Sequence, residues 1–150
     1  MAQPEVGRVF PSFDVVVDVG RAMQVADALG ARSTVFGSEL RAAEAGLPGT
    51  PVIPVYFSNA VQFEATGVNP VAQSVSTRAL LGGQEYWFDN GPVFVGENLH
   101  GSSRVSGVEP RTGRSGPLTV VTIETTYARP NGTTALRAVT RSIDFSVSPS

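Results

Sequence analysis

The sequence contains no cysteine and no lysine, and it has a single histidine among its 150 residues. Without cysteine the chain has no disulfide framework, no thiolate metal site and no cysteine nucleophile. One histidine, His100, excludes a metal site built from several imidazoles. The 11 basic residues stand against 13 acidic ones and leave a formal net charge of −2, whereas a nucleic-acid-binding surface usually shows as a basic stripe. We therefore expect no metal, no cofactor and no nucleic-acid partner.

Long apolar segments are also missing. No run approaches the roughly 20 apolar residues that a membrane-spanning helix needs. The first ten residues, which include Glu5 and Arg8, lack the apolar core of a signal peptide. The expectation is a soluble cytoplasmic protein, and a length of 150 residues predicts one domain over residues 1–150.

The first half of the chain carries helical patterns. After a short apolar run at 13–17, Asp18 is a candidate helix cap, and the helical pattern that follows ends at Gly30. A second, short helix is expected over Ser38–Ala45, with a serine cap and a glycine just beyond its end. A third helix is expected over 54–66, because proline suits the first helical position. Its apolar residues occur on nearly every face, which predicts burial on most sides.

The second half of the chain carries strand patterns. Four strands are expected, at Gln84–Phe88, Leu99–Val108, Leu118–Tyr127 and Leu136–Phe145. The last of these alternates apolar residues on one face with Thr140 and Ser142 on the other. An Asn-Gly pair within Arg129–Gly132 predicts a tight hairpin. Helices followed by antiparallel strands indicate an α+β fold, in which a sheet wraps around one central helix.

Three motifs follow one another along this framework. Pro48–Pro54 is rich in proline and leads into the third expected helix. Gly82–Phe88 (Gly-Gly-Gln-Glu-Tyr-Trp-Phe) precedes Val95–Glu97 (Val-Gly-Glu), and Arg111–Val120 joins a basic, glycine-rich turn to a Leu-Thr strand. In this order the motifs resemble the MaoC-like dehydratase family, particularly its N-terminal-domain branch, over residues from about 12 to 145. The resemblance implies a hot-dog fold, an antiparallel sheet wrapped around a central helix.

Members of that family use an Asp and, five residues later, a His in a loop after the first helix. The pair positions a water and moves a proton as the water adds to, or leaves from, an enoyl thioester. When Gly30 and Glu39 are aligned with that loop, the Asp position holds Ala31 and the His position holds Phe36. Neither side chain transfers a proton, so we predict no catalytic residue of this kind. The sequence resembles the inactive subunit of heterodimeric (3R)-hydroxyacyl-thioester dehydratases.

This resemblance implies a non-catalytic, acyl-pocket-forming subunit of a heterodimeric (R)-specific enoyl-thioester hydratase or 3-hydroxyacyl-thioester dehydratase. Such a chain is part of a hydro-lyase without supplying the Asp/His pair itself. The implied partner is a MaoC-like hot-dog subunit that carries the Asp/His loop, or a second copy in a homodimer. The implied ligand is an acyl-CoA or acyl-carrier-protein thioester. A dimer is expected because the open sheet edges of a single hot-dog domain invite pairing.

Candidate substrate-binding residues come from the same comparison. They are Phe36, Val55, Tyr56, Phe57, Asn59, Phe63 and Arg114. The N–H groups of Val55 and Tyr56 would lie at a helix N-terminus, where they could polarise a thioester carbonyl, whereas the neighbouring Pro54 offers no donor. Arg114, with Arg111, could contact the phosphates of CoA or of a pantetheine arm. The competing interpretation is core packing for the aromatic residues and a solvated turn for the arginines.

Two other functions stay open. One is a homodimeric enzyme with a changed active site, a thioesterase or a dehydratase or cyclase of natural-product biosynthesis, that uses Glu64, Asn59, Tyr56 or His100. For Glu64 the competing interpretation is a partnered structural carboxylate, and for His100 it is an exposed side chain on a polar strand. The other function is a dimer that binds an acyl chain or another hydrophobic ligand without converting it.

Overall fold

One antiparallel sheet of five strands organises residues 4–145, which are the part of the chain that the computed structural model describes. The strands are β1 (Phe13–Val16), β2 (Ala79–Trp87), β3 (Asn98–Gly113), β4 (Gly116–Ala128) and β5 (Thr134–Asp144). Their order in the sheet is β1-β3-β4-β5-β2, so β1 and β2 are the two edges. The expected α+β class with an antiparallel sheet is confirmed.

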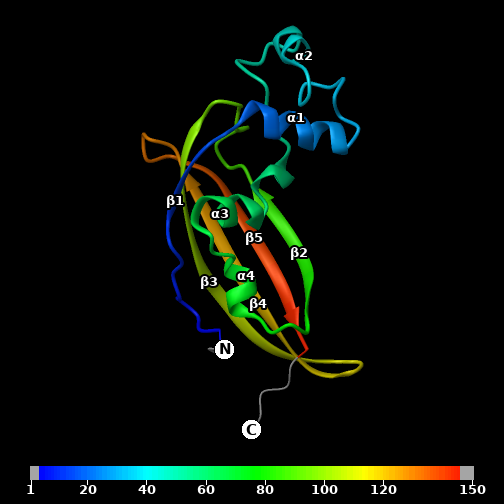
Figure 1. Cartoon of the computed structure of the whole chain (residues 1–150), viewed down its shortest axis with the longest axis vertical. Helices are drawn as coiled ribbons and strands as arrows, with labels where there is room; N and C mark the ends of the chain where they lie inside the picture. The colour runs from blue at the N-terminus through cyan, green and yellow to red at the C-terminus, as the bar shows by residue number, and fades with distance from the viewer. Residues whose placement is uncertain (1–3, 146–150) are drawn as a thin grey trace.

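The helices are short and lie at two places (Figure 1). They are α1 (Val19–Ala28), α2 (Glu39–Glu44), the 3₁₀-helix η1 (Pro54–Phe57), α3 (Asn59–Thr66) and α4 (Pro70–Ser74). The sheet curls around α3 and α4, whereas α1 and α2 lie beyond one end of it (Figure 1). The caps predicted from the sequence are confirmed, since the carboxylate of Asp18 and the hydroxyl of Ser38 accept N–H groups of the first turns of α1 and α2.

The single central helix expected over 54–66 is wrong, because the chain forms two pieces there. Ser58 has an extended backbone (φ −62°, ψ 167°) that ends η1 and begins α3. The expected burial on most sides is also wrong, since α3 buries only Val61 and Gln62 while Phe63 is 53% exposed. The break lets the buried aromatic pair Tyr56–Phe57 point into the core in η1 while α3 lies across the sheet. The face of α3 that points away from the sheet is therefore exposed to solvent.

The four predicted strands are confirmed in sequence order as β2 to β5, with different ends, and the apolar run at 13–17 forms the fifth strand, β1. The long β3–β4 hairpin reaches well beyond the expected segments, because a tight turn between Gly113 and Gly116 lets polar residues pair with one another. The Asn-Gly hairpin is present, and Gly132 takes the left-handed conformation (φ +86°). In β5 the alternation is as expected, and the face carrying Thr140 and Ser142 turns inward, since these residues lie opposite the buried side chains of β4.

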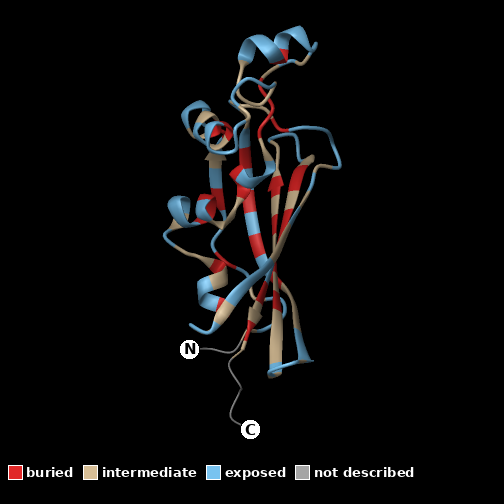
Figure 2. Cartoon of the chain, turned by 90° about the vertical axis from the view of Figure 1, so that its right-hand side faces the viewer, coloured by how far each residue is buried: buried red, intermediate tan, exposed pale blue. Residues whose placement is uncertain are grey.

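The main core lies between the sheet, η1 and α1. Its centre is a set of aromatic rings, in which Phe57 lies 5.0 Å from Tyr56 and 5.1 Å from Tyr127, and Tyr127 lies 5.8 Å from Phe13, measured between ring centroids. The Phe13 ring lies flat against Gly101, where an added Cβ would be 2.3 Å from its Cζ. Burial follows this arrangement, since buried positions alternate with more exposed ones along β3 and β4 (Figure 2).

A polar contact fixes α3 to the sheet. The amide of Gln62 (1% exposed) donates to the hydroxyl of Ser103 at 2.7 Å and accepts from it at 2.9 Å. A weaker bond runs from the same amide to the carbonyl of Pro11 at 3.4 Å. None of the helices within residues 4–145 is long and apolar enough to cross a bilayer.

Candidate functional site

The loop after α1 holds Ala31 and Phe36, the two positions that the sequence analysis aligned with the family's Asp/His pair. Helix α1 ends with Gly30 in the left-handed conformation (φ +68°), and the loop then folds around Thr34. The Thr34 hydroxyl donates to the carbonyl of Ala31 at 2.6 Å and accepts the N–H of Phe36 at 3.2 Å. One hydroxyl thus joins positions 31 and 36 in a single compact turn. Gly37 closes it, because an added Cβ there would lie 2.4 Å from the Cα of Arg32.

This turn presents a methyl group and a half-buried benzyl group, and no titratable acid or imidazole. Residues 29–38 contain one charged side chain, Arg32, which lies 3.9 Å from Asp27 in an exposed pair. General acid–base chemistry needs a group that gains or loses a proton within hydrogen-bond reach of the reacting water. The loop therefore cannot perform it.

The predicted residues at the start of the central helix are only partly available to a ligand. Tyr56 and Phe57 are each 2% exposed and belong to the core, although Tyr56 also reaches a surface groove described below. The N–H of Tyr56 is already bonded to the carbonyl of Ile53 at 3.0 Å, so it is not a free donor for a thioester. Val55 and Phe63, by contrast, are exposed, and Asn59 is half-buried.

The predicted arginines lie far from this region. Arg114 occupies the turn of the β3–β4 hairpin, at the opposite end of the molecule from α1 and α2 (Figure 1). Arg111, on the same hairpin, is bonded to Glu109 at 3.0 Å, and this bond lowers the pKa of the Glu109 carboxyl. The structure thus does not bring Arg114 together with Phe36 or with η1.

The Gln-Glu-Tyr motif of β2 forms part of a polar concave face. The hydroxyl of Tyr86 donates to Gln84 Oε1 at 3.0 Å, and burial raises the pKa of Tyr86. Gln84 lies opposite Thr140 on β5, and the buried hydroxyl of Ser142 follows on the same face. Among residues 4–145, the Ser142 hydroxyl is a buried side-chain group without a hydrogen-bond partner. Sequence reasoning placed this motif on a strand but missed the polar face.

The Val-Gly-Glu turn after β2 is held in place by hydrogen bonds of the Glu97 carboxylate. Glu97 accepts the guanidinium of Arg129 at 2.7 Å and the N–H of Phe94 at 2.8 Å. Partial burial raises the pKa of Glu97, and these two hydrogen bonds outweigh it and hold the pKa below its ordinary value. The turn therefore fixes the loop that leads into β3.

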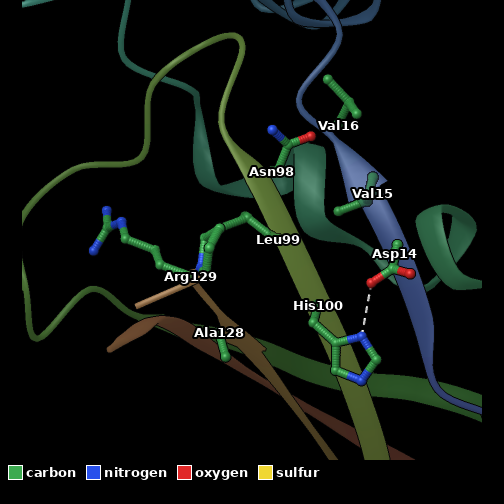
Figure 3. A pocket seen from close by; sticks show the side chains of 9 residues that line it. Asp14, Val15, Val16, Asn98, Leu99, His100, Ala128 and Arg129 are labelled. Carbon is green, nitrogen blue, oxygen red and sulfur yellow. Dashed lines mark hydrogen bonds and ion pairs between the residues drawn. The ribbon is translucent and has the colours of Figure 1, made fainter. Parts of the chain in front are cut away.

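A carboxylate and an imidazole do meet, on the outer face of the sheet. Asp14 and His100 are direct partners across β1 and β3, and their side chains approach to 2.8 Å (Figure 3). Both are well exposed, at 90% and 51%, and they line a hollow of about 390 Å³. Neighbouring Leu99 points into the core, so this pair lies on the side of the sheet away from α3. The pair is remote from the Ala31–Phe36 turn in the chain, and it was not expected from the sequence.

A second groove, of about 560 Å³, runs beside β1. It is lined by the last three residues of β1, the first turns of α1, and residues of η1 and α3. Within it Arg21 pairs with Glu64 and lies over the ring of Tyr56, at 5.2 Å from its centroid. The Tyr56 hydroxyl accepts the N–H of Asp18 at 3.0 Å. Glu64, a candidate base, is thus a partnered carboxylate.

Comparison with known proteins places this geometry in a family. A family model described as FAS1-like, dehydratase domain region, matches residues 5–137. None of the curated proteins matches the sequence.

Solved structures share the fold at low sequence identity. The HadBC (3R-hydroxyacyl-ACP dehydratase) complex from Mycobacterium tuberculosis has a chain with a TM-score of 0.71 and 17% identity, covering 95% of this chain and 99% of that one. A MaoC-like dehydratase from Rhodospirillum rubrum has a TM-score of 0.65 and 19% identity, and the match covers 97% of this chain and 95% of that one. A conserved hypothetical protein from M. tuberculosis with a double hotdog fold has a TM-score of 0.57 and 21% identity, and the match covers 97% of this chain and 44% of that one. The expected hot-dog fold and the resemblance to MaoC-like dehydratases are confirmed.

Proposed function

The chain belongs to the family of FAS1-like dehydratase domains, and on that premise we propose that it is the non-catalytic, pocket-forming subunit of a heterodimeric enzyme. The enzyme is an (R)-specific enoyl-thioester hydratase or 3-hydroxyacyl-thioester dehydratase, and its other subunit carries the Asp/His loop. The observation that carries the proposal is the compact turn in which Ala31 and Phe36 share the hydroxyl of Thr34. A methyl and a benzyl group at these positions supply shape and apolar surface, not proton transfer.

The β2 edge supports association with another hot-dog subunit. As an edge strand, β2 has a row of backbone groups that β5 does not use. It also exposes three large apolar side chains, Leu80 at 64%, Leu81 at 63% and Trp87 at 46%. Exposed apolar surface of this kind on a sheet edge is typical of a protein interface. We infer that the partner pairs with β2, which extends the sheet across the two subunits.

The concave face next to β2 supports a role in the pocket. Its half-buried Gln84 and Tyr86 and the inward-facing Thr140 and Ser142 give one side of the sheet a polar lining. The exposed ring of Phe63, on the side of α3 away from the sheet, is a separate apolar surface that a partner can cover. A pocket beside the polar lining, closed by the partner subunit, suits an acyl chain bound to CoA or to a carrier protein. The proposal assigns this chain the walls and its partner the acid and base.

Hydration of crotonyl-CoA tests the proposal directly. The chain alone is expected to be inactive, and a complex with a MaoC-like subunit that retains the Asp/His loop is expected to be active. Replacing the partner's Asp should abolish the activity of the complex, whereas Phe36→Ala in this chain should change mainly KM. Robust hydration by this chain without a partner would contradict the proposal.

The interface has its own test. Leu81→Arg places a charge on the β2 edge and is expected to abolish complex formation in analytical ultracentrifugation. Leu40→Arg is the matched control, because Leu40 is equally exposed (69%) on the short helix α2. Loss of the complex with Leu40→Arg, or its persistence with Leu81→Arg, would refute pairing at β2.

A second function is favoured by one observation, the Asp14–His100 pair at 2.8 Å in a surface hollow. When the carboxylate accepts a hydrogen bond from the Nδ1–H of His100, Nε2 is left as the base, so a homodimeric hydrolase could use this site. In that case activity on a thioester is a property of the chain alone, and His100→Ala abolishes it. If His100→Ala leaves the activity of the heterodimer unchanged, the pair is a structural contact between β1 and β3.

A further inference from the structure

We propose that the open edge of β1 and the groove beside it bind an extended, basic peptide segment of a partner protein, which adds a strand to the sheet. This site is separate from the proposed interface at β2, because β1 and β2 are opposite edges of the sheet. The proposal does not depend on the proposed enzymatic role.

The backbone of β1 is arranged for strand addition. Val17 exchanges backbone bonds with the β3 side, donating to Glu97 at 2.9 Å and accepting from Gly96 at 2.8 Å. In an antiparallel pair the direction of the backbone groups alternates, so those of Asp14 and Val16 point away from β3. Within residues 4–145, no partner takes the outward N–H groups of these two residues. A peptide strand can bind there through main-chain hydrogen bonds.

The next backbone N–H that points away from β3, after those of Asp14 and Val16, belongs to Asp18, just beyond the end of β1. The N–H of Asp18 donates to the hydroxyl of Tyr56 at 3.0 Å. Tyr56 is 2% exposed and lines the groove, and within residues 4–145 its hydroxyl donates no hydrogen bond. A buried hydroxyl with an unused proton favours an incoming oxygen, and a peptide carbonyl supplies one. Tyr56 therefore marks the end of the binding track.

The groove follows the last three residues of β1. Its volume is about 560 Å³, and the hollow on the other face of the sheet also reaches Asp14, Val15 and Val16. The strand therefore lies between two open hollows, and Figure 1 shows no helix or strand beyond it on that side, where the loop between β4 and β5 passes its upper end. Four residues at about 3.3 Å each give a track of about 13 Å, which fits a short extended segment.

The charge of the groove selects a basic segment. Asp18, Glu64 and Arg21 line the groove, and the carboxylate of Asp14 lies at the same edge on the outer face of the sheet, beside His100. Arg21 is already engaged by Glu64 and by the ring of Tyr56. The formal charge of these four side chains along the β1 edge is therefore −2, which attracts basic side chains and repels the phosphates of CoA or an acidic carrier protein. A second copy pairing through β1 would bring two such acidic sets together, so a basic partner fits better than self-association.

A labelled peptide tests strand addition. The probe is a fluorescein-labelled hexapeptide, Thr-Arg-Val-Arg-Val-Thr, titrated with the full chain and followed by fluorescence anisotropy. Two control peptides carry Glu in place of Arg, or N-methyl groups on alternate backbone nitrogens. Binding of the first peptide alone, weakened by added salt, is the expected result. Equal binding of the N-methylated peptide, or of the Glu peptide, would overturn the proposal.

Variants of the chain locate the binding. Glu64→Gln should weaken the basic peptide by about threefold to tenfold, as expected for a partly exposed charge at an interface, while Glu39→Gln on α2 should leave it unchanged. Val16→Pro removes an outward N–H and should abolish binding, with Val16→Thr as the control that keeps it. If Glu64→Gln leaves the affinity for the basic peptide unchanged, the carboxylate of Glu64 does not contribute to peptide binding and the proposal is rejected. A chain that self-associates at micromolar concentration and becomes monomeric with Val16→Pro identifies a second copy as the occupant and also rejects the proposal.

Discussion

The buried pair Gln62–Ser103 gives the most quantitative test of how α3 is held on the sheet. Both residues are 1% exposed, and their two contacts measure 2.7 and 2.9 Å. Ser103→Ala leaves the buried amide with only the long bond to Pro11 O, and an unsatisfied buried polar group costs about 1–3 kcal/mol. Gln62→Leu leaves the Ser103 hydroxyl unpaired and should cost about 1–2 kcal/mol for the same reason.

The double variant distinguishes this explanation from simple packing loss. Replacing both partners with apolar groups of similar shape removes the desolvation penalty, so Gln62→Leu/Ser103→Ala should lie within about 1 kcal/mol of the wild type. The coupling between the two sites is then about 2 kcal/mol. With a urea m-value of about 2 kcal/mol/M, the unfolding midpoint falls by up to about 1.5 M for Ser103→Ala and up to about 1 M for Gln62→Leu.

Equilibrium urea unfolding, followed by circular dichroism, measures all three variants. Ser102→Ala is the matched control, because this neighbouring serine is exposed on the other face of β3 and should change stability by less than about 0.5 kcal/mol. The reasoning is refuted if the two single effects add in the double variant. It also fails if both single variants are as stable as the wild type.

Three further predictions concern single positions. Ser142→Ala should leave the free energy of unfolding unchanged or raise it by up to about 1 kcal/mol, because the buried hydroxyl has no hydrogen-bond partner among residues 4–145. A marked fall in the urea midpoint of this variant would show that the hydroxyl has a stabilising partner. Gly101→Ala should cost about 3 kcal/mol or more, since the new Cβ would meet the ring of Phe13 at 2.3 Å, and thermal unfolding measures the loss. The pKa of Glu97 is lowered in the folded protein, so its pair with Arg129 stabilises the fold above the ordinary glutamate pKa of about 4.3 and loses this contribution as the pH falls through the folded value. Urea midpoints between pH 7 and pH 3 should therefore drop less steeply for Glu97→Gln than for the wild type, and parallel curves would contradict the assignment.

Local patterns predicted most of the sheet. The period-two alternation of β4 and the Asn-Gly pair at Gly132 need no knowledge of distant residues. The break at Ser58 and the short helix α4 were not predicted, because the apolar composition of 54–66 fits a continuous helix equally well. The inward orientation of Thr140 was also beyond the sequence, since alternation tells which residues share a face but not which face meets the core.

Part of the candidate site was likewise predicted from the sequence, and part of it was not. Aligning the loop after α1 with the family's motif predicted that Ala31 and Phe36 lie in that loop, and the structure places them in one turn there. The two hollows beside β1 had no local signal, because their contacts join residues far apart in the chain. Tyr56 and Asp18 are separated by 38 positions, and His100 and Asp14 by 86. Only the folded sheet brings such residues together.

The two edges of the sheet differ in the physical properties that select a partner. β2 is nine residues long and exposes Leu80, Leu81 and Trp87, whereas β1 is four residues long and presents Asp14 beside an acidic groove. Because three strands lie between them, the edges are about 19 Å apart at a spacing of about 4.8 Å. A partner at one edge does not cover the other. Under the two proposals, a hot-dog subunit occupies β2 while a basic segment binds β1, and this chain then links an active partner to a third protein.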